Sequence, residues 1–240
     1  MSSRGFTFKQ FHISHDRCGM KVGTDGILLG AWAPVAVARR ILDLGTGSGL
    51  VALMLAQRVQ AERKVADVEI VGLELDAAAV RQAIENVAAS PWPSKVLIEQ
   101  GAIQDYQAAS FDLIVSNPPY FEAGQAFDCA ARGQARHTAS LSVAELFFHA
   151  KRLLVPEGRL ALVLPRQALA MALQEAELND LHLAERQDVY TKEGKDAQRF
   201  LLLFSSVKCC EITEKLIINT ENGGLGDKYM DLVRPFYLKM

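Results

Sequence analysis

The hydrophobic positions in the middle of the chain alternate between short continuous runs and helical spacings. Four continuous apolar runs of strand length occur, at residues 40–44, 68–75, 96–98 and 111–116. Such runs are typical of strands that are buried on both faces, as in a parallel sheet. After the second run, Val80, Ile84 and Val87 recur at a helical spacing and predict the buried face of a helix that Asp76 caps. The alternation predicts a doubly wound α/β fold with a mostly parallel sheet.

The C-terminal half continues this alternation and then departs from it. Residues 141–154 predict a helix, and a strand at 159–164 follows it after Gly158. Two further strands, at 181–190 and 198–207, are separated by a polar stretch that is too short for a helical crossover. We therefore expect these two strands to be antiparallel, which gives the sheet an antiparallel C-terminal strand.

The two ends of the chain carry weaker patterns. A short apolar strand is expected at 216–218, and a terminal helix is expected around 229–238. Because no linker separates either end from the rest, we expect one domain over residues 1–240. It would carry an N-terminal arm (1–38) and a C-terminal extension (208–240).

Composition narrows the class of protein. The chain has 240 residues, is 50% hydrophobic and has a net charge of −2, which excludes an intrinsically disordered protein. The longest uncharged apolar stretch, residues 27–38, is shorter than the roughly 20 residues of a membrane span, and residues 1–10 lack the apolar segment of a secretory signal. The four cysteines have no zinc or disulfide spacing. We therefore expect free thiols in a cytoplasmic protein with neither a metal site nor a membrane partner.

The small net charge conceals an uneven distribution. Residues 1–40 contain six basic and two acidic residues, a local charge of +4, whereas residues 41–110 contain five basic and nine acidic residues, a local charge of −4. Overall neutrality therefore does not exclude a nucleic-acid partner.

A glycine-rich segment, Asp43-Leu44-Gly45-Thr46-Gly47-Ser48-Gly49, follows the first strand of the expected sheet. Doubly wound folds bind cofactors at this position, because glycines let the backbone approach a ligand and the next helix offers its positive N-terminus. The dinucleotide fingerprint would need a further glycine at Leu50, and no lysine follows the loop as a P-loop requires. The segment therefore predicts a cofactor loop of another kind.

The D-x-G-x-G-x-G pattern resembles the first motif of the S-adenosylmethionine-dependent methyltransferases. The resemblance implies a Rossmann-like methyltransferase fold that binds S-adenosyl-L-methionine, with Asp43 orienting the methionine part and the glycines packed under it. Glu74 and the adjoining Leu75 end the second strand, and Glu74 is then placed to accept both ribose hydroxyls. The alternative is a purely structural turn with an exposed Glu74.

The segment after the third strand departs from the family pattern. The family often has an aspartate there that binds the adenine amine of the cofactor, and this chain has Ala102 instead. By the resemblance, Ile103 packs on the adenine, and either Gln104 or Asp105 supplies the acceptor.

The motif Asn117-Pro118-Pro119-Tyr120 ends the fourth strand, beside the position expected for the transferred methyl group. The Asn117 side-chain oxygen and the Pro118 carbonyl can each accept one N–H of an exocyclic amine. Pro119 stiffens the turn, and Tyr120 offers a flat face on which a base stacks, worth about 1–3 kcal/mol. Catalysis would then rest on positioning and desolvation. The alternative is a Pro-Pro turn with no catalytic role.

Together with these two motifs, residues 6–10 and 15–26 closely resemble the bacterial methyltransferases that make N6-methyladenine next to the anticodon of valine tRNA. The resemblance implies that the anticodon stem-loop is the partner and that the N-terminal segment closes over the cofactor. Lys21, Thr24 and Asp25 would then lie near the methionine end. In the alternative interpretation, the last two of these residues turn the chain and cap a helix beginning at Ile27.

The long stretch between Tyr120 and residue 141 carries Arg132, Arg136 and His137. Loops of this length are usually functional or disordered. One hypothesis is a lid that orders on RNA, with these side chains at the phosphates; the other is a surface loop without a role.

Two competing functions remain at this point. The same motif serves methyltransferases that act on guanine N2 of ribosomal RNA or on a protein glutamine amide, because both targets carry an NH2 group on a planar carbon. Those families have a sizeable extra domain that this chain lacks. The other rival is a non-catalytic module that binds cofactor and RNA, which Asn117 and Tyr120 argue against. The oligomeric state is left open.

Overall fold

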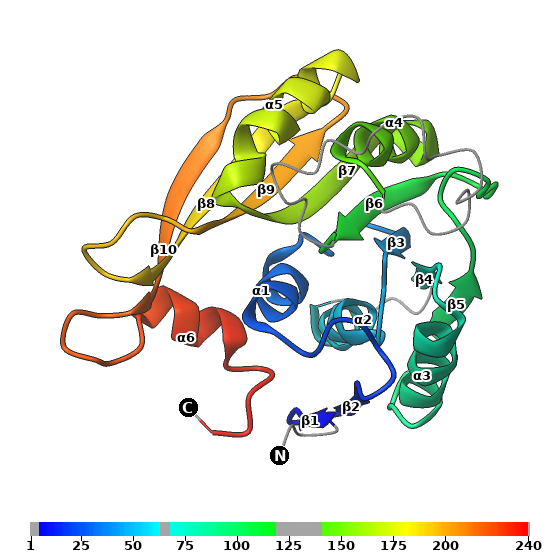
Figure 1. The fold of residues 1–240 in the computed structure, drawn as a ribbon, viewed down its shortest axis with the longest axis horizontal. Coiled ribbons are helices and arrows are strands. Elements are labelled where there is room, and N and C mark those ends of the chain that lie inside the picture. Colours follow the sequence, from blue (N-terminus) through cyan, green and yellow to red (C-terminus); the bar gives the residue numbers. More distant parts are fainter. Residues whose placement is uncertain (1–4, 63–67, 119–140, 240) are drawn as a thin grey trace, which may run out of the picture.

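The computed structural model describes residues 5–62, 68–118 and 141–239. Its eight-stranded sheet is built from β3 (Arg40–Leu44), β4 (Glu69–Glu74), β5 (Val96–Gln100), β6 (Phe111–Ser116), β7 (Leu154–Pro165), β8 (His182–Lys192), β9 (Arg199–Ser205) and β10 (Ile212–Asn219). The strand order is β10-β8-β9-β7-β6-β3-β4-β5 (Figure 1). The described strand pairs of this sheet are parallel except for the two that β9 makes with β7 and β8. The predicted fold class is confirmed.

Helices cover both faces of the sheet (Figure 1). On one side lie α1 (Thr24–Trp32), α2 (Leu50–Glu62) and α3 (Ala77–Ala88), and on the other lie α4 (Val143–Leu153) and α5 (Leu169–Leu178). A short helix, α6 (Asp227–Val233), packs against α1 and β10. None of the helices in the described part of the chain is long and apolar enough to span a membrane.

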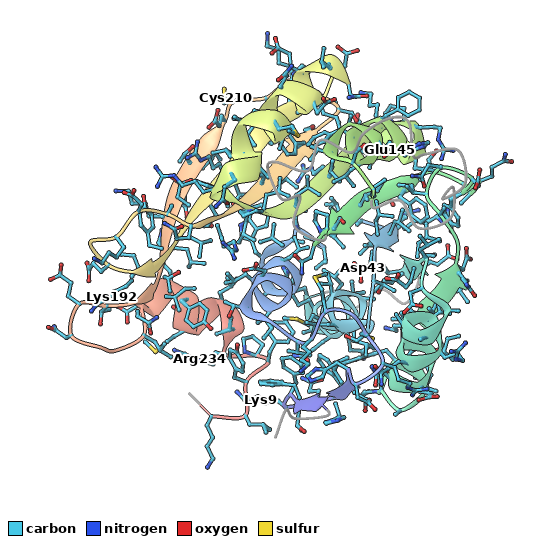
Figure 2. All side chains as sticks on the ribbon, in the orientation of Figure 1. Lys9, Asp43, Glu145, Lys192, Cys210 and Arg234 are labelled. Atoms are coloured by element: carbon cyan, nitrogen blue, oxygen red, sulfur yellow. The ribbon has the colours of Figure 1, made fainter. Side chains whose placement is uncertain are left out.

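The two ends of the chain meet beside α2. The N-terminal arm forms a hairpin of β1 (Gly5–Thr7) and β2 (His12–Ser14). The Lys9 amide donates to the Phe236 carbonyl over 2.8 Å, and the Lys9 ammonium donates to the Arg234 carbonyl over 2.6 Å (Figure 2). The rings of Phe8 and Tyr237 lie 6.4 Å apart in a stacked arrangement. The C-terminal extension therefore supports the arm directly.

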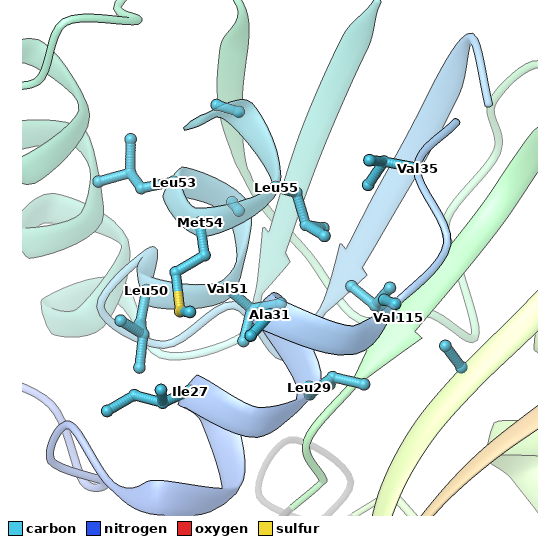
Figure 3. Close-up of a cluster of buried hydrophobic side chains, with 14 of the residues drawn as sticks. Ile27, Leu29, Ala31, Val35, Leu50, Val51, Leu53, Met54, Leu55 and Val115 are labelled. Atoms are coloured by element: carbon cyan, nitrogen blue, oxygen red, sulfur yellow. The ribbon is translucent and has the colours of Figure 1, made fainter. Parts of the chain in front are cut away.

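The apolar strands contribute side chains to two hydrophobic clusters, one on each face of the sheet. In β3, Ile41 joins the cluster with α1 and α2 shown in Figure 3, whereas Leu42 joins the cluster with α4 and α5. This division explains why the strand is apolar at successive positions. Helix α1 approaches α2 so closely that a Cβ on Gly30 would lie 2.8 Å from Met54. The glycine therefore sets the distance between the two helices.

Several elements differ from the expectations. Ile84 is 48% exposed, while Gln82 and Asn86 are 0% and 4% exposed, because both amides hydrogen-bond the N-terminal arm. Helix α1 begins at Thr24, so the helix expected from Ile27 starts three residues earlier. Helix α6 ends at Val233, well before the expected end of the terminal helix. Helix α5 and the β1–β2 hairpin were not predicted.

Candidate active site

A cavity of about 550 Å³ opens at the carboxyl ends of β3, β4, β5 and β6. Its wall is formed by the ends of these strands together with a short piece of the N-terminal arm. The lining includes Cys18, Gly19, Met20, Gly45, Gly47, Leu73, Glu74, Leu75, Gly101, Ala102, Ile103, Gln104, Ser116, Pro118 and Leu141. A volume of this size is typical of a site for a small organic ligand.

The glycine loop depends on backbone conformations that other residues rarely adopt. Gly45, Gly47 and Gly49 have φ angles of 74°, 54° and 81°, and a Cβ in this left-handed region is strained. The amides of Gly45 and Thr46 both donate to the Leu73 carbonyl, over 2.9 and 3.1 Å. These bonds hold the loop against the end of β4, with Gly45 and Gly47 on the cavity wall.

Asp43 lies beneath this loop and is 1% exposed. Its Oδ2 accepts hydrogen bonds from Thr46 Oγ1 over 2.6 Å and from the Ala52 amide over 3.0 Å. Burial raises the pKa of Asp43 to about 7, although both hydrogen bonds oppose the rise. The carboxyl group thus fixes the loop and the first turn of α2. Asp43, Thr46 and Gly49 are not among the residues that line the cavity, and a role of Asp43 toward the methionine part stays a prediction.

Glu74 joins the end of β4 to the glycine loop. Its Oε2 accepts from the Gly47 amide, and its Oε1 accepts from the amides of Leu75 and Asp76, each over 2.9 Å. A carboxylate has about four acceptor positions, so these three bonds orient the group and leave it able to accept from a hydroxyl. Glu74 lies on the cavity wall, and the adjoining Leu75 exposes 49% of its surface there.

The segment after β5 forms another part of the wall. Ala102, Ile103 and Gln104 line the cavity, whereas Asp105 is not among the lining residues. Ile103 is 3% exposed and belongs to the apolar cluster under α4. Of the two candidate acceptors, Gln104 is therefore the one that the structure brings to the cavity.

Asn117 and Pro118 follow β6 directly at the same edge of the sheet. Ser116 Oγ donates to the Leu44 carbonyl over 2.8 Å, which fixes the end of β6 to the end of β3. Pro118 is buried on the cavity wall, and Asn117 is half-buried beside Gly26 in the first turn of α1. Pro119 and Tyr120 lie outside the described residues.

Asp25 is placed by α1 at this edge, where it forms an ion pair with Arg199. Arg199 Nε lies 2.9 Å from Asp25 Oδ2, and the two side chains are 33% and 16% exposed. Lys21 and Thr24 are exposed, and none of the three arm residues assigned to the cofactor is among the cavity-lining residues. Their role at the methionine end stays a prediction. Arg132, Arg136 and His137 lie outside the described residues.

Comparison with known proteins identifies the family. The sequence profile described as Methyltransferase small domain matches residues 20–191. The chain belongs to this methyltransferase family. It is 54% identical over 237 residues to a relative from Aeromonas salmonicida, with 98% of each chain covered. It is 45% identical over 240 residues to one from Tolumonas auensis, which covers 100% of this chain and 99% of the relative.

Both relatives are named tRNA1(Val) (adenine(37)-N6)-methyltransferase. Among solved structures, a protein from Agrobacterium tumefaciens described as a predicted O-methyltransferase has a TM-score of 0.65 at 19% identity, covering 88% of this chain and 96% of that one. At this identity the likeness shows the fold alone. The resemblance inferred from the motifs is confirmed by the closer relatives.

The cavity of this methyltransferase fits S-adenosyl-L-methionine. The oriented Glu74 carboxylate offers acceptors to a pair of hydroxyls, and Leu75 and Ile103 supply apolar walls for a purine. Gly45 and Gly47 carry no side chain that would occupy the space above the loop. The residues present therefore suit a nucleoside that carries a short polar chain.

Three contributions to this site were missed from the sequence. Residues 18–20 line the cavity; the N-terminal segment was expected over the cofactor, but Lys21, Thr24 and Asp25 were assigned to it in place of these three residues. A Cβ on Gly72 would lie 2.8 Å from Thr46 Oγ1, so the absence of a side chain at Gly72 lets the glycine loop pack against β4. An isolated glycine in an apolar strand often marks such a close approach, so the sequence did contain a signal for it. Arg199 stands 174 residues from Asp25, and no local pattern relates the two.

In the described part of the chain, no group of three or more His, Cys, Asp or Glu side chains could hold a metal ion. Among the described residues, Cys18, Cys209 and Cys210 are free thiols; Cys129 lies outside them.

Proposed function

We propose that this protein transfers a methyl group from S-adenosyl-L-methionine to the exocyclic N6 of adenine 37, next to the anticodon of tRNA(Val). The observation that carries the proposal is the position of Pro118 on the wall of a cofactor-sized cavity. Asn117 precedes it in the chain, half-buried directly after β6. The relatives named for this reaction match at 45–54% identity over nearly the full chain, which supports the choice of substrate.

When bound, S-adenosyl-L-methionine supplies an electrophilic methyl group. Asn117 Oδ1 and the Pro118 carbonyl each accept a hydrogen bond from one N–H of the adenine amine. The two bonds fix the nitrogen and leave its lone pair free to face the cavity. Charge develops on this nitrogen during transfer, and the two acceptors stabilise it there. No strong base is required, because the cationic amine releases its proton readily. The main contributions of the chain are positioning and the exclusion of water.

The target base must leave its stack in the anticodon loop to reach this edge of the sheet. In the proposal, Tyr120 stacks on the extruded base, and Arg132, Arg136 and His137 contact phosphates of the anticodon stem-loop. Because the proposed substrate is a tRNA, we expect the enzyme to act in the cytoplasm.

The test is to incubate the protein with methyl-labelled S-adenosyl-L-methionine and, in parallel reactions, with bulk tRNA that lacks the modification, with ribosomal RNA and with total cell protein. The RNA is then digested to nucleosides and the protein to amino acids. We expect the label in N6-methyladenosine. Label in N2-methylguanosine of ribosomal RNA, or in glutamine of a protein substrate, would contradict the proposal and favour the corresponding rival. If the protein binds the cofactor and no substrate is labelled, it is a binding module.

A further inference from the structure

Helix α3 presents two buried amides to the N-terminal arm. Gln82 is 0% exposed, and its Oε1 accepts from the Arg17 amide over 2.9 Å and from Cys18 Sγ over 3.2 Å. Its Nε2 donates to Asp16 Oδ1 over 2.7 Å. Burial raises the pKa of Cys18 to about 11, so the thiol keeps the hydrogen that it donates. Both ends of the Gln82 amide are therefore used on three consecutive residues of the arm.

Asn86, one turn further along α3, connects the arm to the glycine loop. It is 4% exposed, its Oδ1 accepts from the Ser14 amide over 3.0 Å, and its Nδ2 donates to the carbonyls of Ser14 and Ser48, each over 2.8 Å. Between the two amides, Glu85 forms an ion pair with the Arg17 guanidinium. One face of α3 thus binds residues 14–18 through backbone and side-chain groups.

The same stretch continues directly into the wall of the cavity. Cys18, Gly19 and Met20 line the cavity together with Glu74 and Asp76. We call residues 14–20 the strap. At its other end the strap continues from β2, whose hairpin the C-terminal extension supports. Residues 15–20 belong to no helix or strand, so their course depends on these contacts.

We propose that Gln82 and Asn86 are cofactor-positioning residues, which hold the strap in place as the wall over the nucleoside end of the cavity before the cofactor binds. The inference rests on the proposed function, because it assigns the cavity to S-adenosyl-L-methionine. An ordered wall lowers the entropy cost of binding. Burying two amides on a helix is costly unless they are hydrogen-bonded. Apart from the bond from Asn86 to the Ser48 carbonyl, the side-chain hydrogen bonds of Gln82 and Asn86 described above go to the strap.

The first test is Gln82→Met, which keeps the length of the side chain and removes both polar ends. We expect the Kd for S-adenosylhomocysteine, measured by calorimetry on the cofactor-free protein, to rise about tenfold, which corresponds to about 1.4 kcal/mol. The kcat at saturating cofactor and the KM for tRNA should stay within about twofold. The Arg17 amide should exchange its hydrogen faster in the cofactor-free variant, because it loses its acceptor.

A charge-swapped pair keeps the test decisive if Gln82→Met fails to fold. Gln82→Glu places a second carboxylate against Asp16 and should raise the Kd. Adding Asp16→Asn supplies an amide donor to the new carboxylate, and we expect the Kd to return to within about threefold of the wild-type value. Asp16→Asn alone is the control, because its side-chain oxygen still accepts from Gln82.

A Gln82→Met protein that melts at a lower temperature and binds S-adenosylhomocysteine like the wild type would show that the amide only stabilises the fold. A swapped pair that binds no better than Gln82→Glu alone would also overturn the proposal. Failure of the wild-type protein to bind S-adenosylhomocysteine would instead contradict the proposed function, so the two failures are distinguishable.

Discussion

The carboxyl edge of the sheet has two halves that are built in different ways. In the half formed by β3, β4 and β5, Asp43 is fixed by Thr46 and Ala52 within its own loop and helix, and Glu74 accepts from amides of the next loop and of its own turn. In the half formed by β6, β7 and β9, Asn117 lies against the first turn of α1, and Asp25 reaches Arg199 across the fold. The floor of the first half is a cradle of two adjoining strand-and-loop units, to which the strap adds one long-range wall. The second half depends throughout on contacts between distant segments.

From this difference we predict that cofactor binding and methyl transfer can be separated by mutation. The cradle is fixed by its own hydrogen bonds, so damage to the second half should leave cofactor affinity intact. Damage to the cradle should weaken binding and spare the transfer step at saturating cofactor. The following substitutions test this separation, in order of decreasing effect.

Asn117→Ala should have the largest effect. Removing one of the two acceptors leaves the amine unpositioned and should lower kcat about 10²–10³-fold, the size found when one group that stabilises developing charge is removed. The Kd for S-adenosylhomocysteine should change less than threefold. Asn179→Ala, at the end of α5, is the matched control. A kcat within tenfold of the wild type would contradict the assigned role.

Glu74→Gln tests the cradle. The substitution removes the negative charge of the carboxylate that would accept hydrogen bonds from the ribose hydroxyls. It also turns an NH2 group toward backbone amides, which are themselves donors. The Kd for S-adenosylhomocysteine should therefore rise about 10–100-fold. The kcat at saturating cofactor should change little. Glu69→Gln on the same strand is the control, because its carboxylate pairs with Arg40 away from the cavity. Equal Kd values for the two variants would argue against a role of Glu74 in binding.

Gly47→Ala tests the conformation of the loop. At a φ of 54° the added Cβ should cost about 1–2 kcal/mol, seen as a lower melting temperature and about tenfold weaker cofactor binding. Gly224→Ala, at a glycine whose φ is outside the left-handed region, is the control. Unchanged melting and binding would show that the loop tolerates a side chain.

Asp43→Asn should have the smallest effect, seen only in the pH dependence of stability. Burial raises the pKa of Asp43 to about 7, above an unfolded value of about 3.9. The stabilising contribution of the protonated carboxyl is therefore present at low pH and is lost as the pH rises from about 4 to 7. The free energy of unfolding of the wild type should therefore fall, relative to that of the variant, as the pH rises over this range. Urea titrations at several pH values measure it, and a constant difference would contradict the ionisation.

The sequence predicted the features that depend on local pattern. The strand at 111–116 has the expected bounds, and Asp76 caps α3 by accepting from the amides of Ala78 and Ala79. The cofactor loop could also be predicted from the sequence, because its left-handed positions are glycines. These features needed no knowledge of distant segments.

The features that could not be predicted depend on contacts between distant segments. Helical spacing placed Ile84 inward, whereas the helix turns Gln82 and Asn86 inward because the arm supplies their partners. Arg199 reaches Asp25 because the pairing of β9 with β7 places Arg199 opposite Pro165, at the end of β7. The polarity of a residue alone indicates neither arrangement.

The most direct test of the proposed activity uses two transcripts of tRNA(Val), one with adenine and one with guanine at position 37. After incubation with S-adenosyl-L-methionine, mass spectrometry of nuclease fragments locates any added methyl group. The account predicts one methyl group in the fragment that contains adenine 37, recovered as N6-methyladenosine, and none in the guanine transcript. Equal methylation of both transcripts, or a methyl group elsewhere in the tRNA, would contradict it.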